Sequence, residues 1–383
     1  MNARTQATKP PRLHRRLMQY DPVLGYRFVP RLKLRIPHEG GGYLVKTNGD
    51  GFRCDHQVTP RKNRAHRVLV FGDSFTAGDG VSNGKRYSDV LEANLSDTEV
   101  LNFGLSNSGT DQQYLIFQQY AGKIDYDAVV IAVLVENIQR NVARERGWAD
   151  HTGEVIRVPK PWFELSPGHG LTLKGVPVPL PYKADMTAPE DGRGSLRTSL
   201  RRMVNRLGPD FKDFCQRLTR FQPLPEYGSP SSDGWKLLHA ILKKWVSELE
   251  VPVVIAVIPL YQYVEETASY KDIRRRFDEL AQSIDAPVYH VIDDMQREPA
   301  ETRRQLRFRI DCHLTPNAHK IIGQALAKVV APLLGGAATR DTDPVSAPAV
   351  VTVDTWQATR DGTAGKQGIV AAGRASPSES VGT

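Results

Sequence analysis

The sequence predicts an α/β protein built on a parallel sheet with helices on both faces. From about residue 67 onward, short apolar segments alternate with amphipathic helical segments. The apolar segments lack the in-and-out alternation of a half-exposed strand, so both of their faces are expected to be buried. Strands that alternate with helices form parallel sheets with right-handed crossovers. With 383 residues, 40% of them hydrophobic, the chain is long enough to bury one sizeable core.

Five segments are predicted to be the strands of this sheet. Each is short and rich in Val, Ile and Leu, and they span residues 67–71, 99–103, 128–135, 253–259 and 287–292. Ligands of such sheets bind at the carboxyl ends of the strands. Residues that follow a strand are therefore the first candidates for chemistry.

Four segments between and after these strands are predicted to be helices. The first begins at Thr110, a favourable N-cap residue. The second, residues 231–249, places Trp and Leu at helical intervals behind two serines, and a third covers residues 271–284. In the last, residues 315–334, Thr315 is expected to cap the helix and Pro316 to occupy its first turn.

The remaining regions interrupt or flank a main domain of residues 20–336. Residues 20–65 contain aromatic residues separated by Gly, Pro and Asn-Gly-Asp-Gly, which predicts one or two hairpins beside the sheet. Residues 145–230 are too long for an ordinary crossover and are interpreted as an insertion. Residues 1–19 form a basic segment, and residues 337–383 are poor in aromatic residues and are expected to be a disordered tail.

The formal net charge of +8 is interpreted as a basic, soluble surface. Eight Arg or Lys residues lie between positions 193 and 220, and residues 195–207 form a basic amphipathic helix pattern. Such a helix either packs on its own domain or makes peripheral contact with an anionic membrane. No nucleic-acid-binding signature accompanies it, so nucleic acid is not expected as a partner. Three scattered cysteines and the lack of a secretory signal or long apolar run predict a cytoplasmic protein.

A candidate nucleophile follows the first strand, in the stretch HRVLVFGDSFTAGDG. Ser74 comes directly after that strand, but a serine needs a base, a group that orients the base, and donors for an oxyanion. Asp311 and His313 are two residues apart before the last helix, so their side chains can lean the same way in an extended loop. Between them, Cys312 is interpreted as a small packing residue. His319, beyond the start of the helix, is expected at the surface.

These residues resemble a known family. Gly72-Asp73-Ser74, with Gly78 following, resembles the first block of the SGNH hydrolases, also called GDSL esterases and lipases. The segment DCHLTPNAH is similar to their last block, which carries the catalytic Asp and His. Thr76 stands where the Gly-x-Ser-x-Gly elbow of α/β-hydrolases would have its second glycine. The resemblance covers residues 67–138 and 250–335 and implies a flavodoxin-like three-layer α/β/α sandwich with a five-stranded parallel sheet.

The resemblance also implies an oxyanion hole in which the backbone N–H of Ser74 is one donor. The segment NFGLSNSGTDQ corresponds to the second family block, with Asn107 at the usual glycine position and Gly109 after it, so either backbone N–H is a candidate. In the third block, LVENIQRN, Asn137 matches the side-chain donor, whereas a shift of one residue would place Glu136 there. A carboxylate would repel the oxyanion, so Asn137 is preferred.

The function that this resemblance implies is a serine esterase in which Ser74 attacks, His313 is the base and Asp311 orients it. YDPVLGYRFVP and TNGDGFR look like the N-terminal segment of bacterial members tied to cell-surface polysaccharides, and they are interpreted as a structural hairpin beside the sheet. The resemblance implies an acetylated carbohydrate, a lipid ester or a thioester as substrate. No long apolar lid segment is present, which argues against long acyl chains, so an O-acetylated carbohydrate is the expected substrate. An acyltransferase to a polysaccharide hydroxyl and a non-catalytic carbohydrate-binding or scaffold protein of the same fold are the alternatives. No ligand spacing for a metal and no phosphate-binding loop is present, so no cofactor is expected. The oligomeric state is left open.

Overall fold

The computed structural model describes residues 17–149, 155–166, 170–183 and 221–335, with the single positions 168 and 218. Contacts within the chain divide it into a unit of residues 1–338 and a unit of residues 339–383, and every described residue belongs to the first. Residues 1–16 of the basic segment, the predicted helix at 195–207 and the whole predicted tail of residues 337–383 lie outside the described residues, so the predictions made for them stay predictions.

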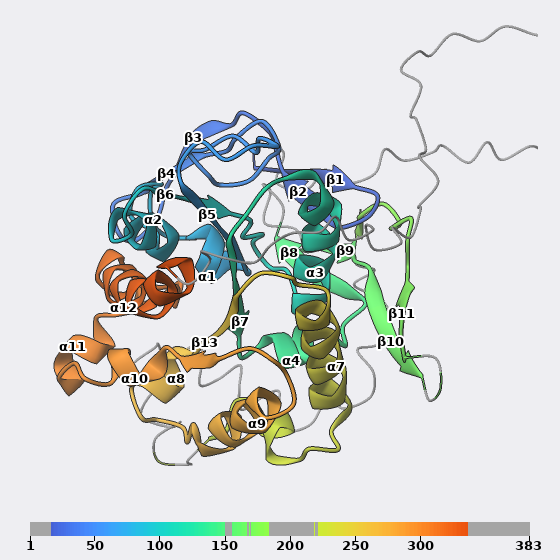
Figure 1. The fold of residues 1–383 in the computed structure, drawn as a ribbon. Coiled ribbons are helices and arrows are strands. Elements are labelled where there is room, and N and C mark those ends of the chain that lie inside the picture. Colours follow the sequence, from blue (N-terminus) through green and yellow to red (C-terminus); the bar gives the residue numbers. More distant parts are fainter. Residues whose placement is uncertain are drawn as a thin grey trace, which may run out of the picture. The chain divides into compact units, whose positions relative to one another are not determined.

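A five-stranded parallel sheet lies at the centre of this unit (Figure 1). Its strands are β5 (His66–Phe71), β6 (Thr98–Asn102), β7 (Ala128–Leu134), β13 (Val253–Ile258) and β14 (Val288–His290), in the order β14-β13-β7-β5-β6. All four neighbouring pairs are parallel. This is the strand order of flavodoxin-like sheets, and its switch point lies between β5 and β7. The predicted fold class is confirmed.

Helices cover both faces of the sheet and complete a three-layer sandwich (Figure 1). On one face α2 (Tyr87–Ala93) packs against α12 (Pro316–Gly335). On the other, α3 (Thr110–Tyr120) packs against α7 (Asp233–Ser247), and α9 (Lys271–Ala281) contacts α7 through aromatic rings that meet edge-on. The shorter helices are α1 (Ser74–Ala77), α4 (Asn137–Arg140), α8 (Tyr261–Val264), α10 (Ile292–Met295) and α11 (Ala300–Arg304), with 3₁₀ turns at Ala121–Lys123 and Pro225–Gly228.

The predicted helix starts are right to within two residues, but only one predicted cap forms. The Ser232 side chain accepts a hydrogen bond from the backbone N–H of Trp235 and caps α7, as expected. Thr110 is already the first residue of α3, and Gly109 occupies the N-cap position. The Thr315 hydroxyl donates to the carbonyl of Gln305 and so ties α12 to the preceding loop.

Two antiparallel hairpins form the N-terminal region. The first joins β1 (Met18–Asp21) to β2 (Gly25–Phe28), and the second joins β3 (Lys33–Ile36) to β4 (Tyr43–Lys46). Aromatic residues of the first hairpin, Tyr26 and Phe28, are fully buried and belong to the same hydrophobic core as the central sheet. The first hairpin is therefore part of the main core.

The described residues of the insertion between positions 145 and 183 form two small antiparallel sheets. One contains β8 (Glu145–Ala149), β9 (Val155–Pro159) and β12 (Tyr182–Lys183), and the other contains β10 (Trp162–Ser166) and β11 (Gly170–Lys174). A fully buried ion pair between Lys160 and Asp111 fastens the insertion to α3. Separating the pair would leave a buried charge without its partner, which is strongly destabilising. The contact therefore fixes the insertion against α3.

His319 lies inside the protein, so its predicted place at the surface is wrong. Its side chain is fully buried, and its Nδ1 atom accepts a hydrogen bond of 3.1 Å from the backbone N–H of Tyr87. One turn along α12, a Cβ atom on Gly323 would lie 2.6 Å from the carbonyl oxygen of Tyr87. The glycine lets the two helices approach closely, and this contact buries the histidine. None of the described helices is long and apolar enough to cross a membrane.

Candidate active site

Ser74 lies at the carboxyl end of β5, beside the switch point of the sheet. The chain leaves the strand at Gly72 and enters α1 at Ser74, and the Asp73 carboxylate caps this helix by accepting from the backbone N–H of Phe75 at 3.0 Å. Ser74 itself is only 5% exposed. A buried strand therefore ends on a capped turn that holds one hydroxyl in a defined position.

His313 and Asp311 meet Ser74 from the far end of the chain. The distance from His313 Nε2 to Ser74 Oγ is 2.9 Å, and the distance from His313 Nδ1 to Asp311 Oδ2 is 2.8 Å. The loop that carries them is closed by a hydrogen bond from the Phe308 N–H to the His313 carbonyl at 2.8 Å. Serine, imidazole and carboxylate are thus hydrogen-bonded in series, as in serine hydrolases.

The charges around the imidazole favour its protonated form. Burial works to lower the pKa of His313, but the hydrogen bond to Asp311 and the negative charges of Asp79, Asp311 and Asp73 raise it above the ordinary value. Burial conversely works to raise the pKa of Asp311, and the hydrogen bonds from the histidines hold it below the ordinary value. Asp311 is therefore ionised at neutral pH and stabilises an imidazolium.

The loop after β6 lies directly against the nucleophile turn. The Leu105 N–H donates to the Gly72 carbonyl at 3.0 Å, and a Cβ atom on Gly104 would lie 2.3 Å from the Ala77 backbone nitrogen. Only a glycine allows the loop to approach so closely. The next residues of this loop, Asn107 among them, are thereby brought to the edge of the sheet where Ser74 lies.

Of the two candidate oxyanion donors, the backbone N–H of Asn107 is free of other contacts among the described residues, whereas that of Gly109 is not. Asn107 adopts the left-handed conformation, with φ of 65°, which asparagine tolerates better than most residues. Its N–H, like that of Ser74, donates no hydrogen bond to another described residue. The N–H of Gly109 instead donates to Gln112 Oε1 at 3.2 Å. Of the two alternatives that the sequence left open, the contacts favour Asn107.

A residue of the insertion holds the Asn107 side chain. Arg146, on β8, donates from Nε and from Nη2 to Asn107 Oδ1, at 3.0 and 2.7 Å. Arg146 forms no ion pair with a carboxylate of the described residues, and burial together with nearby Arg140 lowers its pKa. Nothing in the sequence pattern linked Arg146 to Asn107, because the two lie in different structural regions.

Asn137 is fully buried at the start of α4, after β7. Its Nδ2 atom donates to Thr110 Oγ1 at 3.1 Å, which leaves its second N–H without a partner among the described residues. The carboxylate of Glu136 is engaged by Arg140 at 2.5 Å. This hydrogen bond ties Asn137 to α3 and leaves one of its amide hydrogens available.

Arg140 is a site residue that the sequence analysis missed. It is almost completely buried and donates from Nη1 to Asp73 Oδ2 at 2.6 Å and to the Ser108 carbonyl at 3.2 Å. Its single side chain joins the loops that follow β5, β6 and β7. A lone arginine after a strand has no distinctive sequence signal, so only its position in space identifies it.

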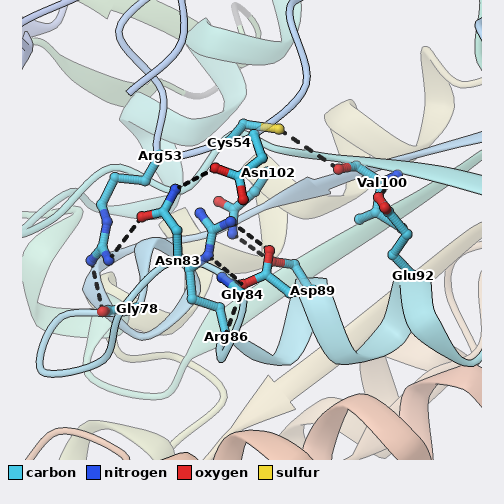
Figure 2. Close-up of polar contacts among 12 residues, drawn as sticks. Arg53, Cys54, Gly78, Asn83, Gly84, Arg86, Asp89, Glu92, Val100 and Asn102 are labelled. Carbon is cyan, nitrogen blue, oxygen red and sulfur yellow. Dashed lines mark hydrogen bonds and ion pairs between the residues drawn. The ribbon is translucent and has the colours of Figure 1, made fainter. Parts of the chain in front are cut away.

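Arg53, also missed, secures the turn that follows Ser74 from the N-terminal region. Its guanidinium donates to the Gly78 carbonyl at 2.7 Å, a bond that Figure 2 shows as a dashed line, and a second bond of 2.7 Å goes to the Val81 carbonyl. Arg53 is fully buried, and burial lowers its pKa to about 10. The segment TNGDGFR, interpreted from sequence as a structural hairpin, thus also supports the nucleophile turn.

A small apolar pocket lies among residues that neighbour this site. Its volume is about 10 Å³, and its lining includes Phe75, Met295, Leu306, Cys312 and Leu314. The Phe75 ring packs against the His313 ring with centroids 5.1 Å apart. A space of this size holds roughly one water-sized group. Among the described residues, no three His, Cys, Asp or Glu side chains are grouped as a metal site would require.

The fold and this geometry define a class, namely an α/β/α sandwich with a hydrogen-bonded Ser–His–Asp series at its switch point. No protein-family model matches the chain, and no curated protein matches it in sequence. Among solved structures, it is similar to a member of the lipolytic protein G-D-S-L family from Veillonella parvula, with 12% identity, a TM-score of 0.36, and coverage of 68% of this chain and 96% of that one.

Two further solved structures are similar to a comparable degree. The lipase/acylhydrolase from Enterococcus faecalis has 12% identity and a TM-score of 0.38, with coverage of 70% of this chain and 96% of that one. The psychrotrophic esterase EstA from Pseudoalteromonas sp. has 12% identity and a TM-score of 0.36, with coverage of 71% and 100%. Likeness at this level assigns no activity, so the roles given below to individual residues rest on the contacts of this chain.

Proposed function

We propose that this protein is a serine esterase of the SGNH type. The observation that carries the proposal is the unbroken series of hydrogen bonds from Ser74 through His313 to Asp311. A serine alone is a weak nucleophile, and an adjacent oriented base is what activates it. A scaffold that had lost catalysis would have no reason to keep this series, so the intact geometry argues against the non-catalytic alternative.

The proposed reaction proceeds in two halves. Ser74 Oγ attacks the ester carbonyl while His313 Nε2 takes the hydroxyl proton, and Asp311 stabilises the resulting imidazolium. The tetrahedral intermediate collapses, the C–O bond to the alcohol breaks, and His313 returns the proton to the departing alcohol oxygen. Water then attacks the acyl-enzyme with His313 again as base, which releases the acid and restores the Ser74 hydroxyl.

Three N–H groups are proposed to stabilise the oxyanion. They are the backbone N–H groups of Ser74 and Asn107 and the second amide hydrogen of Asn137, none of which has a partner among the described residues. Removing one donor of an oxyanion hole typically costs about 3–4 kcal/mol of transition-state stabilisation. The absence of competing partners supports these assignments, whereas Gly109 has a partner already.

The proposed substrate is an O-acetyl ester of a carbohydrate. The preference for a short acyl group rests on the sequence, which contains no long apolar lid segment. The carbohydrate part of the proposal comes from the family resemblance. Transfer of the acyl group to a sugar hydroxyl uses the same acyl-enzyme and remains the second outcome of the test.

The test compares purified protein with its Ser74→Ala variant on p-nitrophenyl acetate, p-nitrophenyl butyrate and an O-acetylated oligosaccharide. Hydrolysis should fall at least about a thousandfold in the variant, and acetate should be the preferred acyl group. Ser231→Ala, which removes an exposed hydroxyl far from α1 in the chain, is the matched control. Mass spectrometry should locate an organophosphonate on Ser74.

The same measurements separate the alternatives. Labelling of Ser74 with slow hydrolysis, and acetylated product when an oligosaccharide acceptor is added, would identify a transferase. Unchanged hydrolysis by Ser74→Ala, or no labelling of the native protein, would overturn the proposed mechanism.

A further inference from the structure

A second histidine contacts the carboxylate that orients His313. His38, in the turn between β3 and β4, places Nε2 at 3.0 Å from Asp311 Oδ2, the same oxygen that His313 Nδ1 contacts at 2.8 Å. The two histidines come from distant parts of the chain, and the sequence separation of 273 between His38 and Asp311 gives no sign of their contact. One carboxylate oxygen therefore accepts from two imidazoles.

The tautomer of His38 follows from its other contact. His38 Nδ1 lies 3.2 Å from the backbone nitrogen of Gly40, which can only donate. Nδ1 must then be the acceptor, and the proton of the neutral ring lies on Nε2. His38 thus donates to Asp311 in its neutral form.

Glu39, the next residue, holds the backbone of the same loop. Its carboxylate accepts from three consecutive N–H groups, those of Arg309, Ile310 and Asp311, at distances of 3.0, 2.9 and 2.8 Å. Side chain and backbone of Asp311 are therefore both held by adjacent residues of one turn. We call His38 and Glu39 together the clamp.

Aromatic packing fixes the position of the clamp. The His38 ring meets the Phe308 ring edge-on, with centroids 4.4 Å apart. The Phe308 ring also lies so close to Gly40 and to Gly80 that a Cβ atom on either glycine would come within 2.7 Å of it. Gly80 belongs to the turn that follows Ser74, so the clamp, the His313 loop and the nucleophile turn pack as one group.

We propose that His38 and Glu39 are positioning residues that hold Asp311 in the orientation His313 requires, a proposal that rests on the esterase function above. The side chain of Asp311 is 37% exposed. An exposed carboxylate on a loop readily turns toward water, and a misplacement of about 1 Å in a catalytic array can cost roughly a hundredfold in rate. The N–H of His38 restricts the side chain, and Glu39 restricts the backbone.

The test uses two variants of His38 that differ in one property. His38→Phe keeps an aromatic ring against Phe308 and removes the N–H donor, whereas His38→Gln keeps a donor and removes the ring. We expect His38→Phe to lower kcat for p-nitrophenyl acetate roughly 10- to 100-fold with little change in KM, and His38→Gln to retain most of the activity. Glu39→Gln should give an intermediate loss, because an amide offers a single acceptor oxygen.

A second readout does not depend on activity. A hydrogen-bonded Nδ1 proton is protected from exchange and resonates far downfield in proton NMR, and the His313 proton is expected to be visible in native protein and in His38→Gln. It should broaden or disappear in His38→Phe. Circular dichroism and thermal unfolding of each variant report whether the fold is retained.

The outcomes separate this proposal from the proposed function. Native activity and NMR signal in a folded His38→Phe, or equal losses in His38→Phe and His38→Gln, would overturn the clamp. If native protein hydrolyses no ester and its Ser74 is not labelled, the esterase function fails. In that case the NMR comparison alone decides whether His38 positions Asp311.

Discussion

The guanidinium of Arg140 lies 2.6 Å from the carboxylate of Asp73, and the pair spans the switch point between β7 and β5. Both side chains are buried, so the ion pair is shielded from water. Asp73 also caps the helix that carries Ser74. Parallel sheets bind their ligands in the crevice at the switch point, and here one buried ion pair stabilises that crevice.

Breaking this pair should destabilise the protein. Arg140→Met leaves the Asp73 carboxylate buried without its partner, and burial already raises the pKa of that group. We expect the free energy of unfolding at pH 7.5, measured in urea, to fall by about 3–5 kcal/mol. Asp73→Asn in the same chain keeps the helix cap and removes the orphaned charge, so it should recover part of the loss. A cost below about 1 kcal/mol for Arg140→Met would show that the pair does not brace the crevice.

The acid limb of the pH–rate profile should report His313. The base must be neutral to accept the Ser74 proton, and its pKa is raised above 6.5 by Asp311, Asp79 and Asp73 against the opposing effect of burial. The ratio kcat/KM should accordingly rise with pH through a midpoint above 6.5.

Asp79→Asn removes one of these charges but keeps the acceptor for the Ser106 hydroxyl. The midpoint of the acid limb should then move to lower pH. A midpoint that stays in place, or moves upward, would exclude Asp79 as a source of the raised pKa of His313.

The contact between Arg146 and Asn107 should affect catalysis by fixing the loop after β6, which carries the proposed oxyanion donor Asn107. Arg146→Met frees the Asn107 side chain, and we expect kcat to fall roughly tenfold while KM changes little. Asn107→Gly keeps the backbone N–H and the left-handed conformation but has no side chain for Arg146 to hold. Adding Arg146→Met to Asn107→Gly should therefore have almost no further effect on kcat. Additive losses in the double variant would instead assign Arg146 a separate role.

Buried His319 should make the protein sensitive to acid. Burial lowers its pKa to about 3, from 6.5. Below pH 6.5 the unfolded chain binds a proton at this position that the folded protein excludes, so stability falls as the pH is lowered toward 3. At pH 5 the loss from this group is about 2 kcal/mol.

His319→Gln supplies an acceptor for the Tyr87 N–H and cannot be protonated. Its free energy of unfolding should decline less steeply than that of native protein between pH 6.5 and 5, and the two slopes should agree near pH 8. Equal slopes across the whole range would mean that His319 does not contribute.

Elements defined by local patterning could be predicted well from the sequence. The five buried strands, the order of strands and helices, and the Ser232 cap depend on side chains that are close together along the chain. The position of Ser74 at a strand end also depends only on residues that are close together along the chain. His319 was misplaced because the same helical pattern fits a surface or a packed face, and only the neighbouring helix α2 decides between them.

By itself the sequence determined the fold class and the three residues Ser74, Asp311 and His313, because apolar periodicity and short motifs encode both. Only the tertiary structure decided which groups surround them: the Arg140 ion pair, the Arg146 contact with Asn107, and the two residues His38 and Glu39 that hold the Asp311 loop. These contacts join residues tens to hundreds of positions apart. They form because several loops meet at one edge of the sheet. Local sequence patterns do not determine which loops meet there.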